Sequence, residues 1–248
     1  MDALSLAAGY SRRLVPLTLT CAKPLLPVGG RPMVDSVLEK VRAIPGVDRT
    51  FLVCNGKFYA DFASWSRRHG GVTVVNDGTM DHAHRLGAVR DIEFVIRTQG
   101  VQDDLLVVAG DNLFDASLGD FVRAARVHAP RVTVGVVDLR DRELIRGRYG
   151  VVQIDSEGHV TAFFEKPDAP VTTLVSTGIY HVPAAQLGVI ARYIEQGGKT
   201  DNIGDLIHAL VRDPGVSSVL LPGRWFDIGD LASYELADKT FRQERREL

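Results

Sequence analysis

Cysteine is scarce in this sequence, which has two cysteines among 248 residues. Cys21 and Cys54 are too few and too far apart for a disulfide framework or a cysteine-based zinc site. They are typical of reduced thiols, so we expect a cytoplasmic protein. No run approaches the roughly 18 apolar residues of a membrane-spanning helix, and the first residues lack the basic start and apolar stretch of a secretory signal. The sequence therefore predicts a soluble protein that has no membrane partner.

An excess of charge of either sign is also absent. The chain has 29 basic and 31 acidic residues, which gives a formal net charge of -2. Proteins that coat nucleic acid usually have a basic excess, so we expect no nucleic-acid partner. Hydrophobic residues make up 45% and charged residues 24% of the chain. This composition is that of an average globular domain and excludes a disordered chain or a fibrous repeat.

Two familiar nucleotide-binding motifs are missing as well. Gly9 follows a predicted first strand, but no further glycines continue the G-x-G-x-x-G spacing of dinucleotide-binding folds. Gly198-Lys199-Thr200 resembles the end of a phosphate-binding P-loop, yet Tyr193 stands where the first glycine belongs. The sequence thus favours neither a dinucleotide-dependent dehydrogenase nor a P-loop NTPase.

Short apolar runs alternate with longer amphipathic stretches, a pattern typical of strands alternating with helices. In the first part we predict strands at 4–8, 50–53, 72–75 and 105–109, and helices at 33–43, 57–68 and 85–98. In the second part we predict strands at 132–137, 150–154, 160–164, 174–182 and 216–221, and helices at 184–195, 203–211 and 230–246. We expect one domain over residues 1–248, an α/β fold with a mainly parallel, mixed central sheet flanked by helices and a small β-rich part.

The segment after the first predicted strand carries the strongest chemical signal. The small residues at positions 7–9 let the backbone approach a planar or anionic ligand closely. Arg12 and Arg13 follow at once, and Lys23 comes ten residues later. Backbone N–H groups and fixed cations are what a triphosphate needs. Taken alone, a solvated surface loop explains these basic residues about equally well.

Residues 6–18 (LAAGYSRRLVPLT) and 22–33 (AKPLLPVGGRPM) resemble the signature of the sugar-phosphate nucleotidyltransferases, the pyrophosphorylases that make nucleoside-diphosphate sugars. The family pattern is approximately L-A-A-G-x-G-T-R-L-x-P-L-T, then P-K-P-L-L-P-V-x-G-x-P. Three departures stand out: Ser11 replaces the second glycine, Arg12 replaces a Thr or Ser, and Ala22 replaces a proline. The resemblance implies a Rossmann-like nucleotidyltransferase fold, with a nucleotide-binding half over about 1–112 and a sugar-phosphate-binding half over about 113–248.

Four downstream segments resemble the same family, namely 107–112 (VVAGDN), 164–167 (FEKP), 176–180 (STGIY) and 225–230 (WFDIGD). The resemblance implies that Asp111 and Asp227 bind Mg²⁺, the one cofactor we expect. A carboxylate after a buried parallel strand does lie where open α/β sheets bind ligands, although an Asp-Asn pair is also a common turn. The resemblance further implies an acceptor site made of Glu165, Lys166, Thr177 and Gly178.

On this resemblance, the predicted catalytic residues are Arg13, Lys23 and Asp111. The predicted nucleotide-binding residues are Ala7, Ala8, Gly9, Ser11, Arg12, Arg13, Asn76, Gly78 and Thr79. The segment that reads the base is the least familiar: after 76–79 the chain offers 85–88 and Asp91, and an ordinary turn explains 76–79 equally well. The sequence does not name the base. It also leaves open whether Arg12 or Arg13 grips the triphosphate, although Arg13 holds the family's position ahead of Leu14.

The implied reaction joins an NTP and a sugar 1-phosphate, or a similar small phosphate, into an NDP-sugar and releases pyrophosphate. An acceptor phosphate oxygen attacks the α-phosphorus in line, so positioning and charge stabilisation matter more than a strong base. One alternative is a cytidylyltransferase for a non-sugar phosphate or phosphonate. Another is a non-catalytic subunit that senses nucleotides, although the basic and acidic residues of the motifs are all retained. Because only a short stretch follows Trp225, we expect no β-helix tail. The oligomeric state stays open, homo-oligomers included.

Overall fold

The first half of the chain builds a parallel sheet in the computed structural model, which describes residues 1–244. Its strands are β1 (Asp2–Ala7), β4 (Arg49–Cys54), β5 (Val72–Asn76) and β6 (Leu105–Ala109). β1 lies between β4 and β6, and β5 continues the sheet beyond β4. Because these strands are parallel, the segments that follow β1 and β6 leave the sheet side by side at the same edge.

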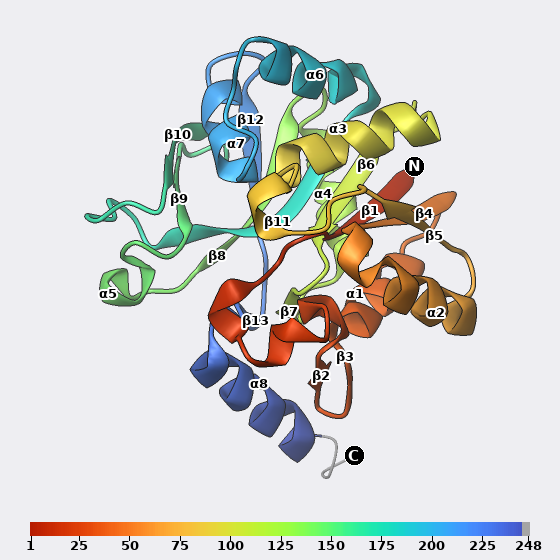
Figure 1. Cartoon of the computed structure of the whole chain (residues 1–248). Coiled ribbons are helices and arrows are strands. Elements are labelled where there is room, and N and C mark those ends of the chain that lie inside the picture. Colours follow the sequence, from red (N-terminus) through yellow and green to blue (C-terminus); the bar gives the residue numbers. More distant parts are fainter. Residues whose placement is uncertain (245–248) are drawn as a thin grey trace.

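The second half adds five more strands to the sheet, and they run in both directions. They are β8 (Val132–Asp138), β9 (Gly150–Ile154), β10 (Val160–Glu165), β11 (Leu174–Val182) and β12 (Val216–Leu220). β11 runs antiparallel to β6, and it is flanked in turn by the β9–β10 pair and by β8, which pairs in parallel with β12. Within residues 1–244 these nine strands form one mixed sheet (Figure 1).

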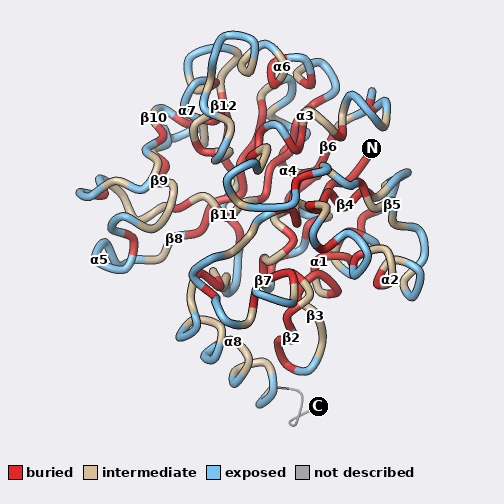
Figure 2. Tube along the Cα trace, viewed as in Figure 1, coloured by how far each residue is buried: buried red, intermediate tan, exposed pale blue. Residues whose placement is uncertain are grey.

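Helices cover both faces of this sheet, which confirms the predicted fold class. One face carries α3 (Ala88–Gln99), α6 (Leu187–Glu195) and α7 (Ile203–Leu210). The other carries α1 (Met33–Arg42), α2 (Tyr59–His69) and α4 (Leu118–Val127). Figure 2 shows the buried strands enclosed between these helices. Over residues 1–244, no helix has the combined length and apolar character needed to cross a lipid bilayer.

Besides six three-residue 3₁₀ helices, two small ribbons and two further α-helices complete the described chain. The ribbons are β2 (Pro27–Val28) with β3 (Arg31–Pro32), and β7 (Leu113–Phe114) with β13 (Trp225–Phe226). The helices are α5 (Arg142–Ile145) and α8 (Leu231–Glu244). α8 packs on the β2–β3 ribbon, where the Tyr234 hydroxyl donates a hydrogen bond to the Pro27 carbonyl at 2.8 Å.

Several predicted boundaries were wrong. Residues 113–131, where we predicted no element, contain α4, whose buried Leu118, Phe121, Val122 and Ala125 follow a helical spacing. The helix predicted at 85–98 begins at Ala88, because Gly87 has a φ of 89° that no α-helix accommodates. The helix predicted at 230–246 begins at Leu231, and positions 245–246 lie outside the described residues.

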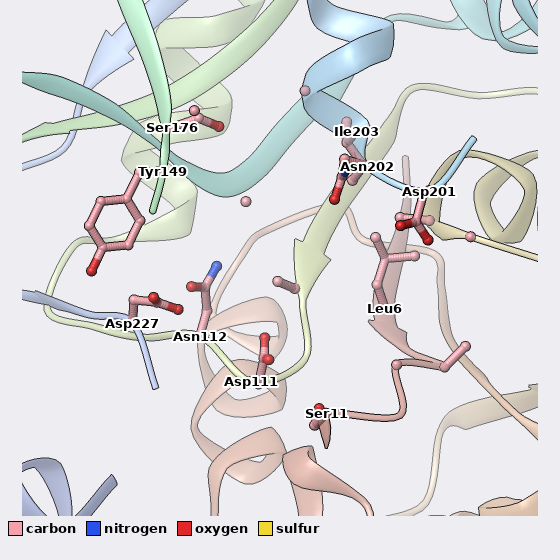
Figure 3. A pocket seen from close by; sticks show the side chains of 18 of the residues that line it. Leu6, Ser11, Asp111, Asn112, Tyr149, Ser176, Asp201, Asn202, Ile203 and Asp227 are labelled. Carbon is pink, nitrogen blue, oxygen red and sulfur yellow. The ribbon is translucent and has the colours of Figure 1, made fainter. Parts of the chain in front are cut away.

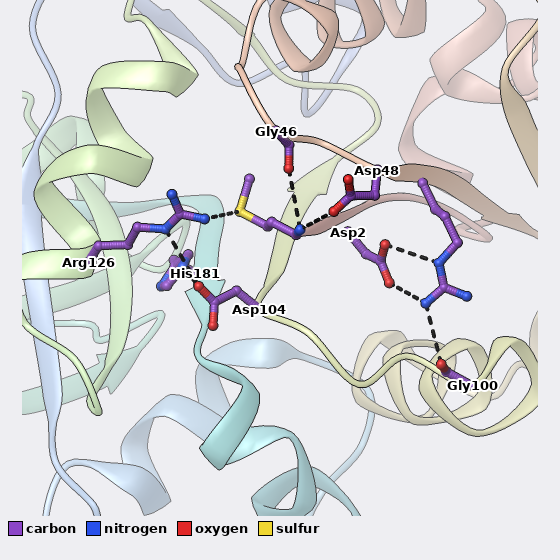
Figure 4. Close-up of polar contacts among 9 residues, drawn as sticks. Asp2, Gly46, Asp48, Gly100, Asp104, Arg126 and His181 are labelled. Atoms are coloured by element: carbon purple, nitrogen blue, oxygen red, sulfur yellow. Dashed lines mark hydrogen bonds and ion pairs between the residues drawn. The ribbon is translucent and has the colours of Figure 1, made fainter.

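Polar contacts fasten the edge of the sheet where β1 begins (Figure 4). The buried Asp2 accepts a hydrogen bond from Arg49 Nε at 3.1 Å. His181 of β11 lies 3.5 Å from the Asp104 carboxylate, which is also 3.6 Å from Arg126 of α4. Burial lowers the pKa of His181, so its imidazole is neutral at pH 7. This polar edge is the one opposite to the carboxyl ends of the parallel strands.

Candidate active site

A cleft of about 480 Å³ opens at the carboxyl ends of β1 and β6, the usual ligand position in open α/β sheets. Its walls come from the loop after β1, the first turn of α3, the turn after β6, the end of β10, the middle of β11, and the start of α7 with the residues before it. Figure 3 shows Asp111, Asn112 and Asp227 on one side of the cleft, with Asp201, Asn202 and Ile203 on the other.

The loop after β1 presents its cations to the cleft through a tight turn. Ser11 adopts a left-handed conformation with a φ of 44°, which explains why glycine suits this position. The Leu14 N–H and the Thr18 hydroxyl both donate to the Ser11 carbonyl, at 3.0 and 2.9 Å, and hold the turn. Arg12 and Arg13 are therefore exposed side chains that line the cleft.

The two predicted metal ligands meet at the end of the β7–β13 ribbon. Phe226 of β13 pairs with Leu113 of β7; Asp111 precedes β7 and Asp227 follows β13, so both carboxylates lie at the same end (Figure 3). Lys23 is 8% exposed, and its Nζ lies 2.6 Å from Asp111 Oδ2. The fold thus brings Lys23, Asp111 and Asp227 together, although Lys23 and Asp227 lie more than 200 residues apart in the sequence.

The two arginines differ in their relation to these carboxylates. A Cβ at Gly229 would lie 3.2 Å from Asp227 Oδ2 and 3.5 Å from Arg13 Nη1, so the Arg13 guanidinium and the Asp227 carboxylate converge over this glycine. The Arg13 charge also acts to lower the pKa of Asp227. This convergence favours Arg13 over Arg12 as the cation at the carboxylate end of the cleft.

Burial is the main cause that raises the pKa of Asp227, and the negative charge of Asp111 raises it further. Lys23, Arg13 and Arg148 act in the opposite direction. Two hard oxygen ligands in such a place suit Mg²⁺, which commonly takes one or two carboxylates and completes its shell with water and substrate phosphates. Within residues 1–244 no cluster of three or more His, Cys, Asp or Glu forms a full protein cage, so the donor set fits Mg²⁺ better than a structural metal.

Asn112 holds the wall between the carboxylates and the acceptor side. Its Nδ2 donates to the Thr177 carbonyl at 2.6 Å, and its Oδ1 accepts from Trp225 Nε1 at 3.0 Å. The Thr177 hydroxyl donates to the Gly135 carbonyl at 2.8 Å, away from the cleft. Thr177 is 2% exposed, and a Cβ at Gly178 would lie 3.2 Å from Ala109. The two predicted acceptor residues on β11 therefore face the cleft mainly with backbone.

Glu165 and Lys166 enter the cleft from the end of β10. Lys166 is exposed, and its Nζ lies 3.2 Å from Glu165 Oε1. The Glu165 carboxylate rests between two glycines: a Cβ at Gly150 would lie 3.3 Å from Oε2, and a Cβ at Gly204 would overlap it. Gly204 is the second residue of α7, where glycine weakens a helix. The space that it leaves for Glu165 explains its presence.

The predicted base-reading residues separate into two groups. Asn76, Gly78 and Thr79 form a turn, and none of the three is among the described residues that line the cleft. Asn76 Oδ1 accepts from the Gly78 N–H at 2.9 Å, and the Thr79 hydroxyl lies 3.0 Å from the Tyr10 hydroxyl. The segment further along the chain does line the cleft, through Arg85, Gly87, Ala88 and Asp91.

Several cleft residues have no short motif that marks them in the sequence. They are His82, Arg148, Tyr149, Asp201 and Asn202. Arg85 pairs with Asp201 through two contacts, Nε–Oδ1 at 2.7 Å and Nη2–Oδ2 at 2.9 Å. This contact joins residues 116 positions apart, so the fold alone reveals it.

The family model for nucleotidyl transferases matches residues 2–244. This chain belongs to the nucleotidyl transferase family, which confirms the resemblance carried by its motifs. It is 26% identical over 248 residues to UTP–glucose-1-phosphate uridylyltransferase AglF of Haloferax volcanii, with 98% of both chains covered. It is 27% identical over 230 residues to the bifunctional protein GlmU of Methanocaldococcus jannaschii, covering 92% of this chain and 51% of that protein.

A solved structure supports the fold independently of the sequence motifs. A candidate glucose-1-phosphate thymidylyltransferase from Bacillus anthracis, solved with sucrose, superposes with a TM-score of 0.82 at 24% identity, covering 98% of this chain and 95% of that one. The present chain spans about half the length of the GlmU relatives that it matches. The chain thus shares its family and its fold with these proteins.

Proposed function

We propose that this protein transfers a nucleotidyl group from an NTP to a sugar 1-phosphate, or a similar small phosphate, and releases pyrophosphate. The observation that carries the proposal is the meeting of Lys23, Asp111, Asp227 and Arg13 at one end of a cleft. The similarity to AglF over nearly the whole of both chains, together with the glucose-1-phosphate uridylyltransferase activity in the name of that protein, supports a sugar 1-phosphate as the acceptor.

Each charged residue has a task in this reaction. Arg13 holds the β- and γ-phosphates and the departing pyrophosphate, and Lys23 stabilises the charge that gathers on the α-phosphate. Lys166 docks the acceptor phosphate, while Glu165 accepts a hydrogen bond from a sugar hydroxyl. Asp111 and Asp227 hold Mg²⁺, which when bound supplies positive charge next to the reacting phosphates.

The chemical balance needs no strong general base. An anionic oxygen of the acceptor phosphate forms the new P–O bond to the α-phosphorus, and the bond to the β-phosphate oxygen breaks as pyrophosphate leaves. The barrier lies in bringing two anions together, and the fixed cations lower it by charge stabilisation. The cytoplasmic location expected from the reduced cysteines remains part of the proposal.

Pyrophosphate release tests the proposal, measured with Mg²⁺ and each of ATP, GTP, CTP, UTP and dTTP in turn, with and without sugar 1-phosphates. Asp111→Asn should lower turnover by about two orders of magnitude or more, because it removes a ligand carboxylate from the reacting phosphates. Asp103→Asn, the same change at an exposed position two residues before β6, should leave turnover unchanged. Thermal unfolding checks that both variants fold.

Release that requires both substrates and fails in Asp111→Asn would support the proposal. Full activity of Asp111→Asn would remove this carboxylate from the reaction. Release only with CTP and a non-sugar phosphate or phosphonate would replace the sugar acceptor. NTP binding without release, whatever the acceptor, would indicate a subunit that senses nucleotides.

A further inference from the structure

A short stretch of the loop after β1 lies between two anchor points. On one side, the Ala8 carbonyl accepts a hydrogen bond from Asn55 Nδ2 at 3.0 Å, and Asn55 is fully buried directly after β4. On the other side, the Ser11 carbonyl accepts from the Leu14 N–H and the Thr18 hydroxyl, at 3.0 and 2.9 Å. Both ends of the stretch are therefore fixed by the fold itself.

Gly9 and Tyr10 lie between these two anchors. Within residues 1–244 neither of them makes a backbone–backbone hydrogen bond. Gly9 is exposed, and a Cβ there would meet only Ser11 Oγ, at 4.0 Å. Tyr10 is half-buried and lines the cleft, and its hydroxyl lies 3.0 Å from Thr79 Oγ1. Because glycine leaves the backbone free to rotate, the shape of this stretch depends on the contact between Tyr10 and Thr79.

Thr79 is oriented in turn by Asp77. The Thr79 N–H and its hydroxyl both donate to Asp77 Oδ1, at 2.7 and 2.9 Å. A threonine hydroxyl has one proton to donate, so Thr79 accepts the hydrogen bond from Tyr10. Burial is the main cause that raises the pKa of Tyr10, so its hydroxyl keeps the proton that this bond needs. The donors therefore run in one direction, from Tyr10 through Thr79 to Asp77.

The turn that carries Thr79 is fastened to the end of β4. The Asp77 N–H donates to the Cys54 carbonyl at 2.9 Å, and the Gly56 N–H donates to the Thr79 carbonyl at 2.7 Å. Thr79 is 8% exposed, and a Cβ at Gly56 would lie 3.0 Å from its carbonyl oxygen. The end of β4 thus supports both this turn and, through Asn55, the loop after β1.

These contacts give Thr79 a task other than reading a base. Thr79 is not among the described residues that line the cleft, and its hydroxyl proton is used by Asp77. A side chain that does not reach the cleft has no access to the edge of a base. Tyr10 does line the cleft, and it directly precedes the left-handed turn at Ser11, after which the two cleft arginines follow.

We infer that Thr79 is a positioning residue for the NTP. It holds the Tyr10 hydroxyl and so keeps the loop after β1 in the shape that brings Arg12 and Arg13 to the triphosphate. The inference rests on the proposed function. Without the Thr79 hydroxyl, the stretch at positions 9 and 10 is free to move, and ligand binding has to order it. The loss then falls on the phosphates and is the same whatever the base.

Calorimetry with Mg²⁺ and without acceptor tests the inference on the intact chain. The two ligands are inorganic tripolyphosphate, which has no base, and whichever of ATP, GTP, CTP, UTP and dTTP the wild type binds most tightly. Thr79→Val keeps the branched shape and removes the hydroxyl. It should bind both ligands about three- to tenfold more weakly than the wild type, the scale of one hydrogen bond. Thr79→Ser, which restores the hydroxyl, should bind both within about twofold of the wild type.

Tyr10→Phe removes the other half of the contact and leaves the bond between Thr79 and Asp77 in place. Alone it should weaken binding of both ligands at least as much as Thr79→Val does. In the Tyr10→Phe background, Thr79→Val should weaken binding no further, because two changes to one contact are not additive. Thr73→Val, the same change at an exposed position of β5, should keep wild-type binding. Thermal unfolding checks that the variants fold, and Tyr10→Phe alone tests the contact if Thr79→Val does not fold.

Wild-type binding of both ligands by Tyr10→Phe or by Thr79→Val would overturn the inference, as would additive losses in the double variant. A loss in Thr79→Val that affects the NTP and spares tripolyphosphate would instead assign Thr79 to the base. A wild type that binds an NTP but no tripolyphosphate would also contradict the inference. In each of these cases pyrophosphate release can persist, and the nucleotidyl transfer then stands. Failure to bind every NTP would overturn the proposed function as well.

Discussion

The raised pKa of Asp91 predicts how the stability of the fold changes with pH. Burial and Asp77 raise its pKa from 3.8 to about 8 in the folded chain. Between these two values the folded chain keeps a proton that the unfolded chain has released. The free energy of unfolding therefore falls as pH rises, by about 1.4 kcal/mol per pH unit. At pH 7 the raised pKa of Asp91 lowers the free energy of unfolding by about 4 kcal/mol relative to low pH, where Asp91 is protonated in both the folded and the unfolded chain.

Asp91→Asn removes the titrating group and keeps its size. Urea unfolding of both proteins should give similar free energies near pH 4 and a growing advantage of the variant above it. Between pH 4.5 and 7.5 the difference should widen by about 4 kcal/mol. Glu93→Gln, at a half-buried carboxylate paired with Arg97, should show no such widening. A difference between wild type and Asp91→Asn that stays constant with pH would refute the reasoning, because it would mean that Asp91 is ionised in the folded chain.

Two further predictions concern the two ends of the cleft. Arg13→Ala should raise the KM for the NTP by about tenfold or more, because loss of a charge-assisted contact to phosphate costs on that scale. Arg12→Ala should raise it by less, because Arg13 is the arginine that converges with Asp227. Equal effects of the two variants in steady-state kinetics would contradict this assignment. Gly204→Ala should displace the Glu165 carboxylate, which the new Cβ would overlap, and raise the KM for the sugar phosphate while the KM for the NTP stays unchanged. Gly188→Ala in α6, where a Cβ meets nothing within 4 Å, is the control, and wild-type acceptor kinetics in Gly204→Ala would contradict the role given to Gly204.

The central strands could be predicted from the sequence because burial on both faces leaves a continuous apolar run, as in β6. α4 was missed although Leu118, Phe121, Val122 and Ala125 have helical spacing. Its apolar residues are interrupted by Gly119 and by charged residues on the outer face. The start of α3 was misplaced because the packing of Gly87 on Thr200 sets it, and that contact is invisible in a local pattern.

Some residues of the site could likewise be predicted from the sequence, whereas others are brought together only by the fold. Arg13 and Lys23 lie in one continuous motif after β1, so the sequence was enough to predict them. The meeting of Asp111 with Asp227 depends on the β7–β13 ribbon, which joins distant segments. Asp91 Oδ1 has no hydrogen-bond partner among the described residues. This depends on which groups pack around it in three dimensions, so the sequence alone could not predict it.

The central claim is that the acceptor phosphate attacks the α-phosphorus of the NTP. It is tested most directly with a sugar 1-phosphate that carries ¹⁸O at the non-bridging oxygens of its phosphate. Mass spectrometry of the products should find all of the label in the NDP-sugar and none in pyrophosphate, because the acceptor oxygens stay attached to their own phosphorus. Label in pyrophosphate, or conversion of the NTP to NMP and pyrophosphate without a joined product, would contradict the claim.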